Sequence, residues 1–258
     1  MSEISSSVQI ADGVSFFVPQ PTSRQSAELG FSYNEIFEDC RYVRYGIQLT
    51  DCARIVDAGA NVGLFTIFAK QQSPAAEVLA VEPIPAIHRA LRANLEAYAI
   101  KGVDTPRTAL GAEHEREVPF TFYPETPGES TRYPEQKRAG QDLTEQQLGH
   151  TEMAAVPREV AVAAEVNRLS ALLRDWAPRE PVDLLKIDVE GAELDVMEGL
   201  DPADWQRTRQ VVVEVQDVCG RLDRIIDELD SRDFSVMVER SRLSEVYRSF
   251  MVYATRRP

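Results

Sequence analysis

The residues with the clearest chemical potential lie in the segment Asp57-Ala-Gly-Ala-Asn-Val-Gly63, which directly follows a short apolar run. Glycine allows the backbone to approach a ligand closely, and the N–H groups that open a helix point toward a bound group. Asp57 can organise this loop and hold a cationic amine. Glu82 ends the next apolar run, where a carboxylate suits a bidentate grip on the two hydroxyls of a ribose. The segment therefore predicts a nucleoside cofactor.

Two cofactors fit such a loop differently. A dinucleotide prefers Gly-x-Gly-x-x-Gly, which leaves room for a pyrophosphate. Here the glycines are Gly59 and Gly63, and Asn61 stands where the second glycine of that pattern would be. S-adenosylmethionine carries no phosphate and fits this spacing better. The alternative is that the glycines only form a tight strand-to-helix turn.

The elements that must position these residues alternate along the chain. Apolar runs typical of buried strands alternate with segments of helical spacing, which is the pattern of a parallel sheet with crossover helices. We expect strands over 54–57, 77–82, 159–162, 182–188 and 210–215, and helices over 62–70, 86–97, 170–176, 192–200 and 222–229. Two further β-like runs, 234–239 and 250–254, suit an antiparallel pair at a sheet edge.

The rest of the chain divides into a cap and an insertion. Residues 1–50 carry a hairpin signal over 8–18 and a helical pattern over 24–50, and we expect them to cap a domain of residues 51–258. This cap contains an aromatic run, Phe31, Tyr33, Phe37, Tyr42 and Tyr45, which forms either core or a shield over the cofactor. Strand-like runs near 103–110 and 117–122 precede residues 124–157, which are rich in proline and glycine. So long a loop is either a lid over the site or a surface insertion.

The composition narrows the partners and the compartment. The 258 residues include 42 acidic and 28 basic side chains, a net charge of −14, which argues against nucleic acid or an anionic membrane surface as the main partner. Three scattered cysteines predict neither a disulfide framework nor a zinc site, and no metal is expected. The polar start and the short apolar runs resemble neither a signal peptide nor a membrane span, so we expect a cytoplasmic protein.

Longer motifs point to one family. They are Val56-Asp-Ala-Gly-Ala-Asn-Val-Gly-Leu-Phe-Thr66, Val81-Glu-Pro-Ile-Pro85 and Leu184-Leu-Lys-Ile-Asp-Val-Glu-Gly-Ala-Glu-Leu-Asp-Val-Met-Glu-Gly199. With these motifs the chain resembles the FkbM family of S-adenosylmethionine-dependent methyltransferases, closest in character to the O-methyltransferases of polyketide and nonribosomal peptide pathways. The resemblance implies an α/β, Rossmann-like class I fold, with a mostly parallel seven-stranded sheet, helices on both faces and an antiparallel C-terminal edge. It also implies methyl transfer to an oxygen of a small secondary-metabolite intermediate.

The resemblance also implies a set of cofactor-binding positions and shows departures from the family. The expected ligands of S-adenosylmethionine are Tyr33, Asp57, Gly59, Ala60, Asn61, Gly63, Thr66, Glu82, Pro83 and Asp188. Polyketide-associated members usually carry histidine at the position of Gln216, and they tend to carry lysine and serine where this chain has Gly191 and Ala192. These departures leave the identity of the acceptor open.

Candidate catalytic residues follow two later strands. Lys186, Asp188 and Glu190 project to one face of an extended strand, and Glu214 ends the next strand, at the edge where doubly wound sheets bind ligands. We expect Asp188 and Glu214 to face the transferred methyl, with Glu190 next to them. The alternative is a buried ion pair that closes the sheet edge. His150, in the insertion, is a further candidate base.

Three other functions remain open at this point. An alcohol acceptor needs a general base, whereas a carboxylic acid is already ionised, so the missing histidine at position 216 makes carboxyl O-methylation of a small acid the first alternative. A nicotinamide-dependent oxidoreductase is less consistent with the absent third glycine. A cofactor-binding module without activity is less consistent with the acids at 188, 190 and 214. The sequence determines neither the oligomeric state nor whether the acceptor is free or tethered to a carrier protein.

Overall fold

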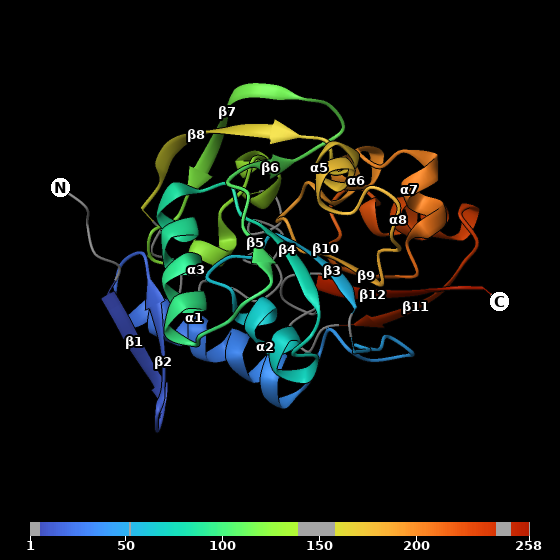
Figure 1. Cartoon of the computed structure of the whole chain (residues 1–258). Coiled ribbons are helices and arrows are strands. Elements are labelled where there is room, and N and C mark those ends of the chain that lie inside the picture. The colour runs from blue at the N-terminus through green and yellow to red at the C-terminus, as the bar shows by residue number, and fades with distance from the viewer. Residues whose placement is uncertain (1–5, 52, 139–157, 241–248, 258) are drawn as a thin grey trace.

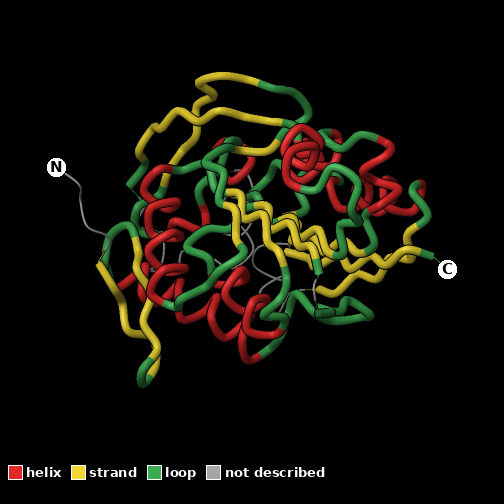
Figure 2. The backbone as a smooth tube through the Cα atoms, in the orientation of Figure 1, coloured by secondary structure: helices red, strands yellow, loops and turns green. Residues whose placement is uncertain are grey.

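The computed structural model describes residues 6–51, 53–138, 158–240 and 249–257. At its centre is a seven-stranded sheet in the order β11-β12-β10-β9-β3-β4-β5, which Figure 2 shows as a twisted band of strands between helices. The strands are β3 (Arg54–Ala58), β4 (Glu77–Val81), β5 (Val103–Asp104), β9 (Leu184–Ile187), β10 (Gln210–Gln216), β11 (Phe234–Arg240) and β12 (Ser249–Arg256). Of these strands, β12 alone runs against both of its neighbours. The expected mostly parallel sheet with an antiparallel C-terminal edge is confirmed.

Helices cover both faces of this sheet (Figure 1). The helices are α2 (Leu64–Gln72) and α3 (Pro85–Ala97) on one face, and α5 (Leu169–Trp176), α6 (Glu193–Glu198), α7 (Pro202–Arg207) and α8 (Arg221–Ser231) on the other. Successive side chains of a strand point to opposite faces, so Ile55 packs into the apolar cluster of α2 and α3, and Val56 into that of α5 to α8. None of the helices in the described ranges is long and apolar enough to cross a membrane.

The N-terminal region forms the expected hairpin but a shorter helix. β1 (Ser6–Ala11) and β2 (Val14–Val18) pair antiparallel around Asp12-Gly13. The helix α1 (Ser23–Tyr33) continues into one π-helical segment, η1 (Asn34–Glu38), after which the chain forms turns and irregular backbone up to residue 50. The expected helix over 24–50 is therefore wrong beyond residue 38.

The helix ends where its backbone bonding changes. The N–H of Asp39 donates to the carbonyl of Asn34, five residues earlier, at 2.8 Å, and Cys40 follows with φ +49°, outside the right-handed helical region. This break redirects the chain, so that Arg41 and Tyr42 become buried against the end of the sheet and do not continue along the helix surface.

A second, three-stranded sheet lies over the first (Figure 1). In it β8 (Val160–Asn167) pairs in parallel with β6 (Ala109–Leu110) and antiparallel with β7 (Glu115–Phe122). The strand expected near 103–110 is therefore divided between two sheets, and Pro106, which has no N–H for a ladder, lies between the two parts. The strand expected over 159–162 extends to Asn167. Its first residue, Val160, pairs with Phe122, so the two strands enclose the insertion.

Asn94 on α3 joins the hairpin to the loop that follows β3. Its Oδ1 accepts a hydrogen bond from Phe17 N at 2.6 Å, and its Nδ2 donates to Phe17 O at 3.0 Å and to Val62 O at 2.8 Å. The Asn94 side chain is fully buried. One amide therefore satisfies three backbone groups and connects the cap to the candidate cofactor loop.

Replacing Asn94 with leucine keeps the side-chain volume and removes these hydrogen bonds. We expect Asn94→Leu to lower the free energy of unfolding by about 2–4 kcal/mol, because buried backbone groups lose their partner. Urea unfolding measures this change, with Gln71→Leu on the exposed end of α2 as a control expected to stay within about 0.5 kcal/mol of wild type. Equal stability of the two variants would contradict the role assigned to Asn94.

Candidate active site

The segment 57–63, called the glycine loop below, forms a tight turn between β3 and α2. The N–H groups of Gly59 and Ala60 both donate to Val81 O, at 3.1 and 3.0 Å, which holds the loop against the end of β4. Gly59 has φ +79°. A Cβ atom at Gly59 would come within 1.8 Å of Asp188 O, at the end of β9. Glycine is therefore required at this position by backbone conformation and by space.

A buried ion pair lies beneath this loop. Lys186 Nζ is 2.9 Å from Asp57 Oδ1, donates to Gly59 O at 2.8 Å, and is 3.5 Å from Asp188 Oδ2. Asp57 Oδ2 accepts a hydrogen bond from Thr66 Oγ1 at 2.6 Å. Burial alone would lower the pKa of Lys186, but Asp57 and Asp188 outweigh it and raise that pKa. The cationic amine that Asp57 contacts is therefore that of Lys186, and a contact of Asp57 with the cofactor stays a prediction.

Glu82 occupies the end of β4 as predicted. Its Oε2 accepts a hydrogen bond from Asn61 N at 3.1 Å and its Oε1 accepts one from Ile84 N at 2.9 Å. Burial raises the pKa of Glu82 to about 7, although these hydrogen bonds oppose the shift. A carboxylate offers about four lone pairs, so each oxygen keeps capacity for a further donor.

Asp188 and Glu214 meet at one residue of the cap. The Tyr42 hydroxyl lies 2.9 Å from Asp188 Oδ2 and 3.0 Å from Glu214 Oε2. Arg41 Nη2 is 3.4 Å from Glu214 Oε1, which also accepts a hydrogen bond from Ser249 Oγ at 3.2 Å. Burial and the charge of Asp188 raise the pKa of Glu214. Asp188 and Glu214 therefore lie on either side of one hydroxyl group, and that they face the transferred methyl stays a prediction.

Glu190 lies on the side of the insertion. Its Oε2 is 3.0 Å from Lys137 Nζ and 3.3 Å from Gln216 Nε2, which donates to it. The Glu190 backbone has φ +52°, and its carbonyl accepts a hydrogen bond from Thr131 Oγ1 at 2.6 Å. Burial raises the pKa of Glu190 to about 8 despite Lys137. Residues 131–137 of the insertion are therefore fastened to the loop that follows β9.

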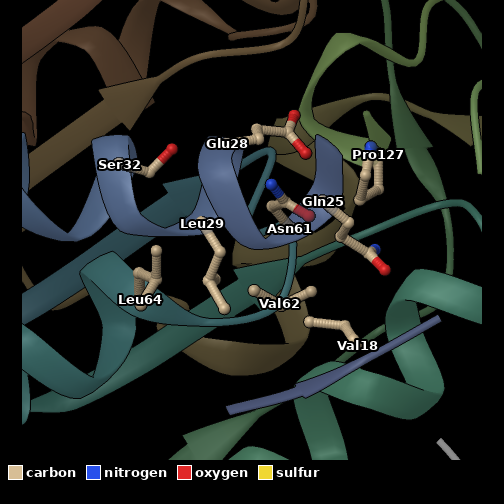
Figure 3. Close-up of a pocket in the computed structure, with 9 residues that line it drawn as sticks. All are labelled: Val18, Gln25, Glu28, Leu29, Ser32, Asn61, Val62, Leu64 and Pro127. Atoms are coloured by element: carbon tan, nitrogen blue, oxygen red, sulfur yellow. The ribbon is translucent and has the colours of Figure 1, made fainter. Parts of the chain in front are cut away.

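A small pocket separates α1 from the glycine loop (Figure 3). Its apolar walls include Leu29, Val62 and Pro127, and its polar members include Glu28 and Asn61. Glu28 Oε1 accepts a hydrogen bond from Gly128 N at 2.9 Å. Burial and the nearby Glu129 raise the pKa of Glu28 to about 8. The insertion thus contacts the cap as well as the loop after β9.

The remaining residues predicted for the site have different surroundings. Tyr33 stacks on Phe37, with ring centroids 4.5 Å apart, within the apolar cluster of α2 and α3. Pro83 follows Glu82 and is half-buried. Gly63 caps α2 with φ +93°. His150 lies outside the described residues.

Sequence reasoning missed three members of this site. Arg41 and Lys137 were not singled out, and Tyr42 appeared only as part of an aromatic run. Their partners lie far away in the chain, since Tyr42 contacts residues 146 and 172 positions later. The signal that could have found Lys137 is its rarity, because the chain has few lysines among many arginines.

Alanine at Gly59 combines backbone strain with a direct clash. We expect Gly59→Ala to destabilise the protein by more than about 3 kcal/mol or to prevent folding, because the left-handed conformation alone costs about 1–2 kcal/mol. The matched control is Gly13→Ala, where φ is +76° and nothing lies within 4 Å of the new Cβ. Thermal unfolding compares the two variants, and equal losses would show that the contact with Asp188 O is unimportant.

Glu28 makes stability depend on pH. Its pKa of about 8 in the folded state exceeds the ordinary value of about 4.3, so its contribution is fully present at low pH and is lost as the pH rises through about 8. Glu28→Gln removes this titrating group. Between about pH 6 and about pH 9 we expect the melting temperature of the variant to fall less than that of the wild type, by about 5–10 °C, because wild-type Glu28 loses about 2.7 kcal/mol over that range.

The matched control for this measurement is Glu96→Gln, on the exposed side of α3. Its pH dependence should follow that of the wild-type protein. A Glu28→Gln protein with the wild-type pH dependence would show that Glu28 ionises freely in the folded state.

Residues 57–236 match the model of the methyltransferase FkbM domain. The chain is 37% identical over 234 residues to Methyltransferase 1 of Beauveria bassiana, covering 90% of each protein. It is 35% identical over 228 residues to the 31-O-demethyl-FK506 methyltransferase FkbM of Streptomyces tacrolimicus, covering 84% of this chain and 86% of that protein.

The fold is similar to that of magnesium protoporphyrin IX methyltransferase from Synechocystis, a structure with bound S-adenosylmethionine. The TM-score is 0.51 and the sequence identity 11%, over 92% of this chain and 86% of that one. This likeness concerns the fold alone. The family match, by contrast, spans the glycine loop, Glu82 and the strand ends that carry Asp188 and Glu214. The chain belongs to the FkbM family of methyltransferases.

Proposed function

We propose that the protein transfers a methyl group from S-adenosylmethionine to a hydroxyl oxygen of a small secondary-metabolite intermediate. The observation that carries this proposal is the partial exposure of Asp188 and Glu214, whose side chains are 24% and 25% exposed beside the glycine loop, whereas Asp57 is fully buried. A partly exposed carboxylate can meet an acceptor hydroxyl and take its proton. The relative from Streptomyces tacrolimicus supports an oxygen target, because its name specifies one.

The residues around the glycine loop fit S-adenosylmethionine. Glu82 keeps lone pairs for two donors, as the hydroxyls of a ribose would be. Asn61 Oδ1 is buried and has no hydrogen-bond partner among the described residues, so it offers an acceptor next to the loop. Bound there, the cofactor would supply a methyl group on a positively charged sulfur, which is already electrophilic. The proposed contacts include Tyr33, Asp57, Gly59, Ala60, Asn61, Gly63, Thr66, Glu82, Pro83 and Asp188.

In this proposal the protein positions the acceptor and removes one proton. Asp188 takes the hydroxyl proton on its carboxylate while the acceptor oxygen bonds to the methyl carbon and the carbon–sulfur bond breaks. Glu214 lies across Tyr42 from Asp188, and Glu190 is held by Lys137 and Gln216. These two acids are the other proposed catalytic residues, together with His150.

Carboxyl O-methylation is the second candidate, and Gln216 favours it. The Gln216 amide donates to Glu190 where the family resemblance leads us to expect a histidine. An ionised acid needs no base there. A carboxylate acceptor would, however, need a positive partner, and Lys137 and Lys186 already contact carboxylates of the chain. Membership of a methyltransferase family leaves no reason to propose a nicotinamide-dependent oxidoreductase.

The proposed setting is the cytoplasm, with a small acceptor that is either free or tethered to a carrier protein. The net charge of −14 disfavours nucleic acid as a partner, because phosphate contacts need a basic surface. An acidic carrier would likewise have to dock on a locally basic part of the surface.

The pH dependence of methyl transfer tests the proposal. Hydroxylated secondary metabolites and the corresponding carboxylic acids are offered with labelled S-adenosylmethionine between about pH 6 and about pH 9. We expect transfer to hydroxyl compounds, with a kcat/KM that changes with pH as the carboxyl groups of the site titrate, because burial raises the pKa of Glu214. Asp188→Asn should lower kcat by about 10²–10⁴-fold. Glu77→Gln, on the exposed start of β4, is the control and should retain full activity.

Two outcomes would contradict this proposal in different ways. Transfer to acids alone, with a flat pH profile, would establish the carboxyl alternative. If calorimetry detects no binding of S-adenosylmethionine or of its demethylated product, the proposed cofactor is wrong. Loss of that binding in Glu82→Ala, with normal thermal stability, would support the cofactor site.

A further inference from the structure

The hydroxyl of Tyr42 has two hydrogen-bonding partners that are both carboxyl groups. It lies 2.9 Å from Asp188 Oδ2 and 3.0 Å from Glu214 Oε2. A tyrosine hydroxyl carries one proton, and an ionised carboxylate is only an acceptor. Two full hydrogen bonds at this hydroxyl, one donated and one accepted, need a proton on one of the two carboxyl groups, whereas two ionised carboxylates would have to divide the single hydroxyl proton. The geometry therefore favours three groups that share two protons.

The charged side chains around Tyr42, Asp188 and Glu214 also favour a bound proton on one of the two carboxyl groups. Lys186 on β9 lies 3.5 Å from Asp188 but shares its charge with Asp57 on β3. Arg41 of the cap lies 3.4 Å from Glu214 and also pairs with Glu35. Four acids thus face two basic side chains. Ser249 on β12 adds a neutral donor to Glu214.

The positions of the two cations indicate which carboxyl group keeps the proton. Asp188 Oδ2 faces Lys186 directly, which favours the ionised form of Asp188. Glu214 shares Arg41 with Glu35, the nearer partner of that arginine. Burial and the charge of Asp188 raise the pKa of Glu214, and burial raises the pKa of Glu35 to about 7. Glu214 is accordingly the better proton holder of the pair.

We propose that Tyr42 is a positioning residue of the methyl-transfer site: it accepts a hydrogen bond from protonated Glu214, donates one to Asp188, and so holds Asp188 ionised and oriented as the proton acceptor. The catalytic part rests on the proposed function, while the sharing of protons does not. In the reaction, the acceptor's O–H proton moves to Asp188 as the oxygen–carbon bond forms and the carbon–sulfur bond breaks. Because Tyr42 belongs to the cap, the base is complete only when the cap is docked.

A purely structural role for Tyr42 predicts different behaviour. Its ring packs against Phe65, with centroids 5.3 Å apart, and Lys186 Nζ lies 5.5 Å from the ring centre. Tyr42→Phe keeps these ring contacts and removes only the hydroxyl. If Tyr42→Phe changes the proton affinity of the neighbouring carboxyl groups, beyond any change in the free energy of unfolding, the positioning role is separated from the structural one.

Fluorine NMR of the cofactor-free protein tests the shared protons directly. Fluorotyrosine replaces Tyr42, and its resonance is followed from about pH 5 to about pH 9. We expect a titration step well above the ordinary carboxyl pKa of about 4.3. Glu214→Gln should abolish this step, because its amide donates like the protonated acid without titrating. Glu35→Gln should retain the step. No step, or a step lost only in Glu35→Gln, would overturn the proposal.

The pH profile of methyl transfer tests the catalytic part, with an acceptor found in the assay above. We expect Tyr42→Phe to lower kcat/KM by about tenfold or more and to move the pH midpoint, with Tyr45→Phe, at a residue 52% exposed, as the unchanged control. An unmoved midpoint would overturn the positioning role. Absence of any transfer by the wild-type protein would count against the proposed function instead, because the NMR step is measured without cofactor or acceptor.

Discussion

The buried ammonium group of Lys186 is the constraint on which the site depends. Its side chain is 4% exposed, and an unpaired charge at such a depth would be prohibitively costly. The chain surrounds it with Asp57 from β3, the carbonyl of Gly59 and Asp188 from the end of β9. Removing one partner of such a buried pair typically costs about 3–5 kcal/mol. A single cation therefore connects the glycine loop to the ends of two strands that their backbone ladder already pairs.

The cap extends this arrangement and is itself anchored to the C-terminal strands. Arg41 and Tyr42 reach Glu214 on β10, while the hydroxyl of Tyr253 on β12 lies 2.8 Å from the carbonyl of Arg41. The same hydroxyl lies 2.8 Å from Glu239 on β11. The antiparallel edge of the sheet thus does more than complete the core, because it holds the cap residues that face the carboxylates.

Much of the fold could be predicted from local patterns, and most of the site's contacts could not. The alternation of buried strands with amphipathic helices predicted β3, β4, β9 and β10 within a residue or two, because burial on a sheet leaves a clear periodicity. The helix over 24–50 failed beyond residue 38, since the π-turn at Asn34–Glu38 has no periodic signature. The strand expected near 103–110 is divided at Pro106 into β5 and β6, which belong to different sheets. A propensity pattern alone does not show that the two parts separate in this way.

The site shows the same division in more detail. Glu82 and the glycine loop were predicted because their spacing along the chain reflects the strand-helix-strand geometry directly. The meeting of Tyr42 with Asp188 and Glu214 depends on how the cap folds back over the sheet, and no local pattern of residues encodes it. Lys137 is a similar case, because its partner Glu190 follows a different strand.

The pairing of Phe122 with Val160 gives the insertion a fixed base. The chain leaves the second sheet at one of these residues and returns at the other, so the ends stay together whatever lies between them. Loop-closure entropy grows only slowly with length, and the described residues of this segment, 123–138 and 158–159, contribute no strand to the central sheet. The fold therefore tolerates a change in the length or sequence of this segment without a change in the central sheet, provided that Lys137 and Gly128 keep their contacts with Glu190 and Glu28.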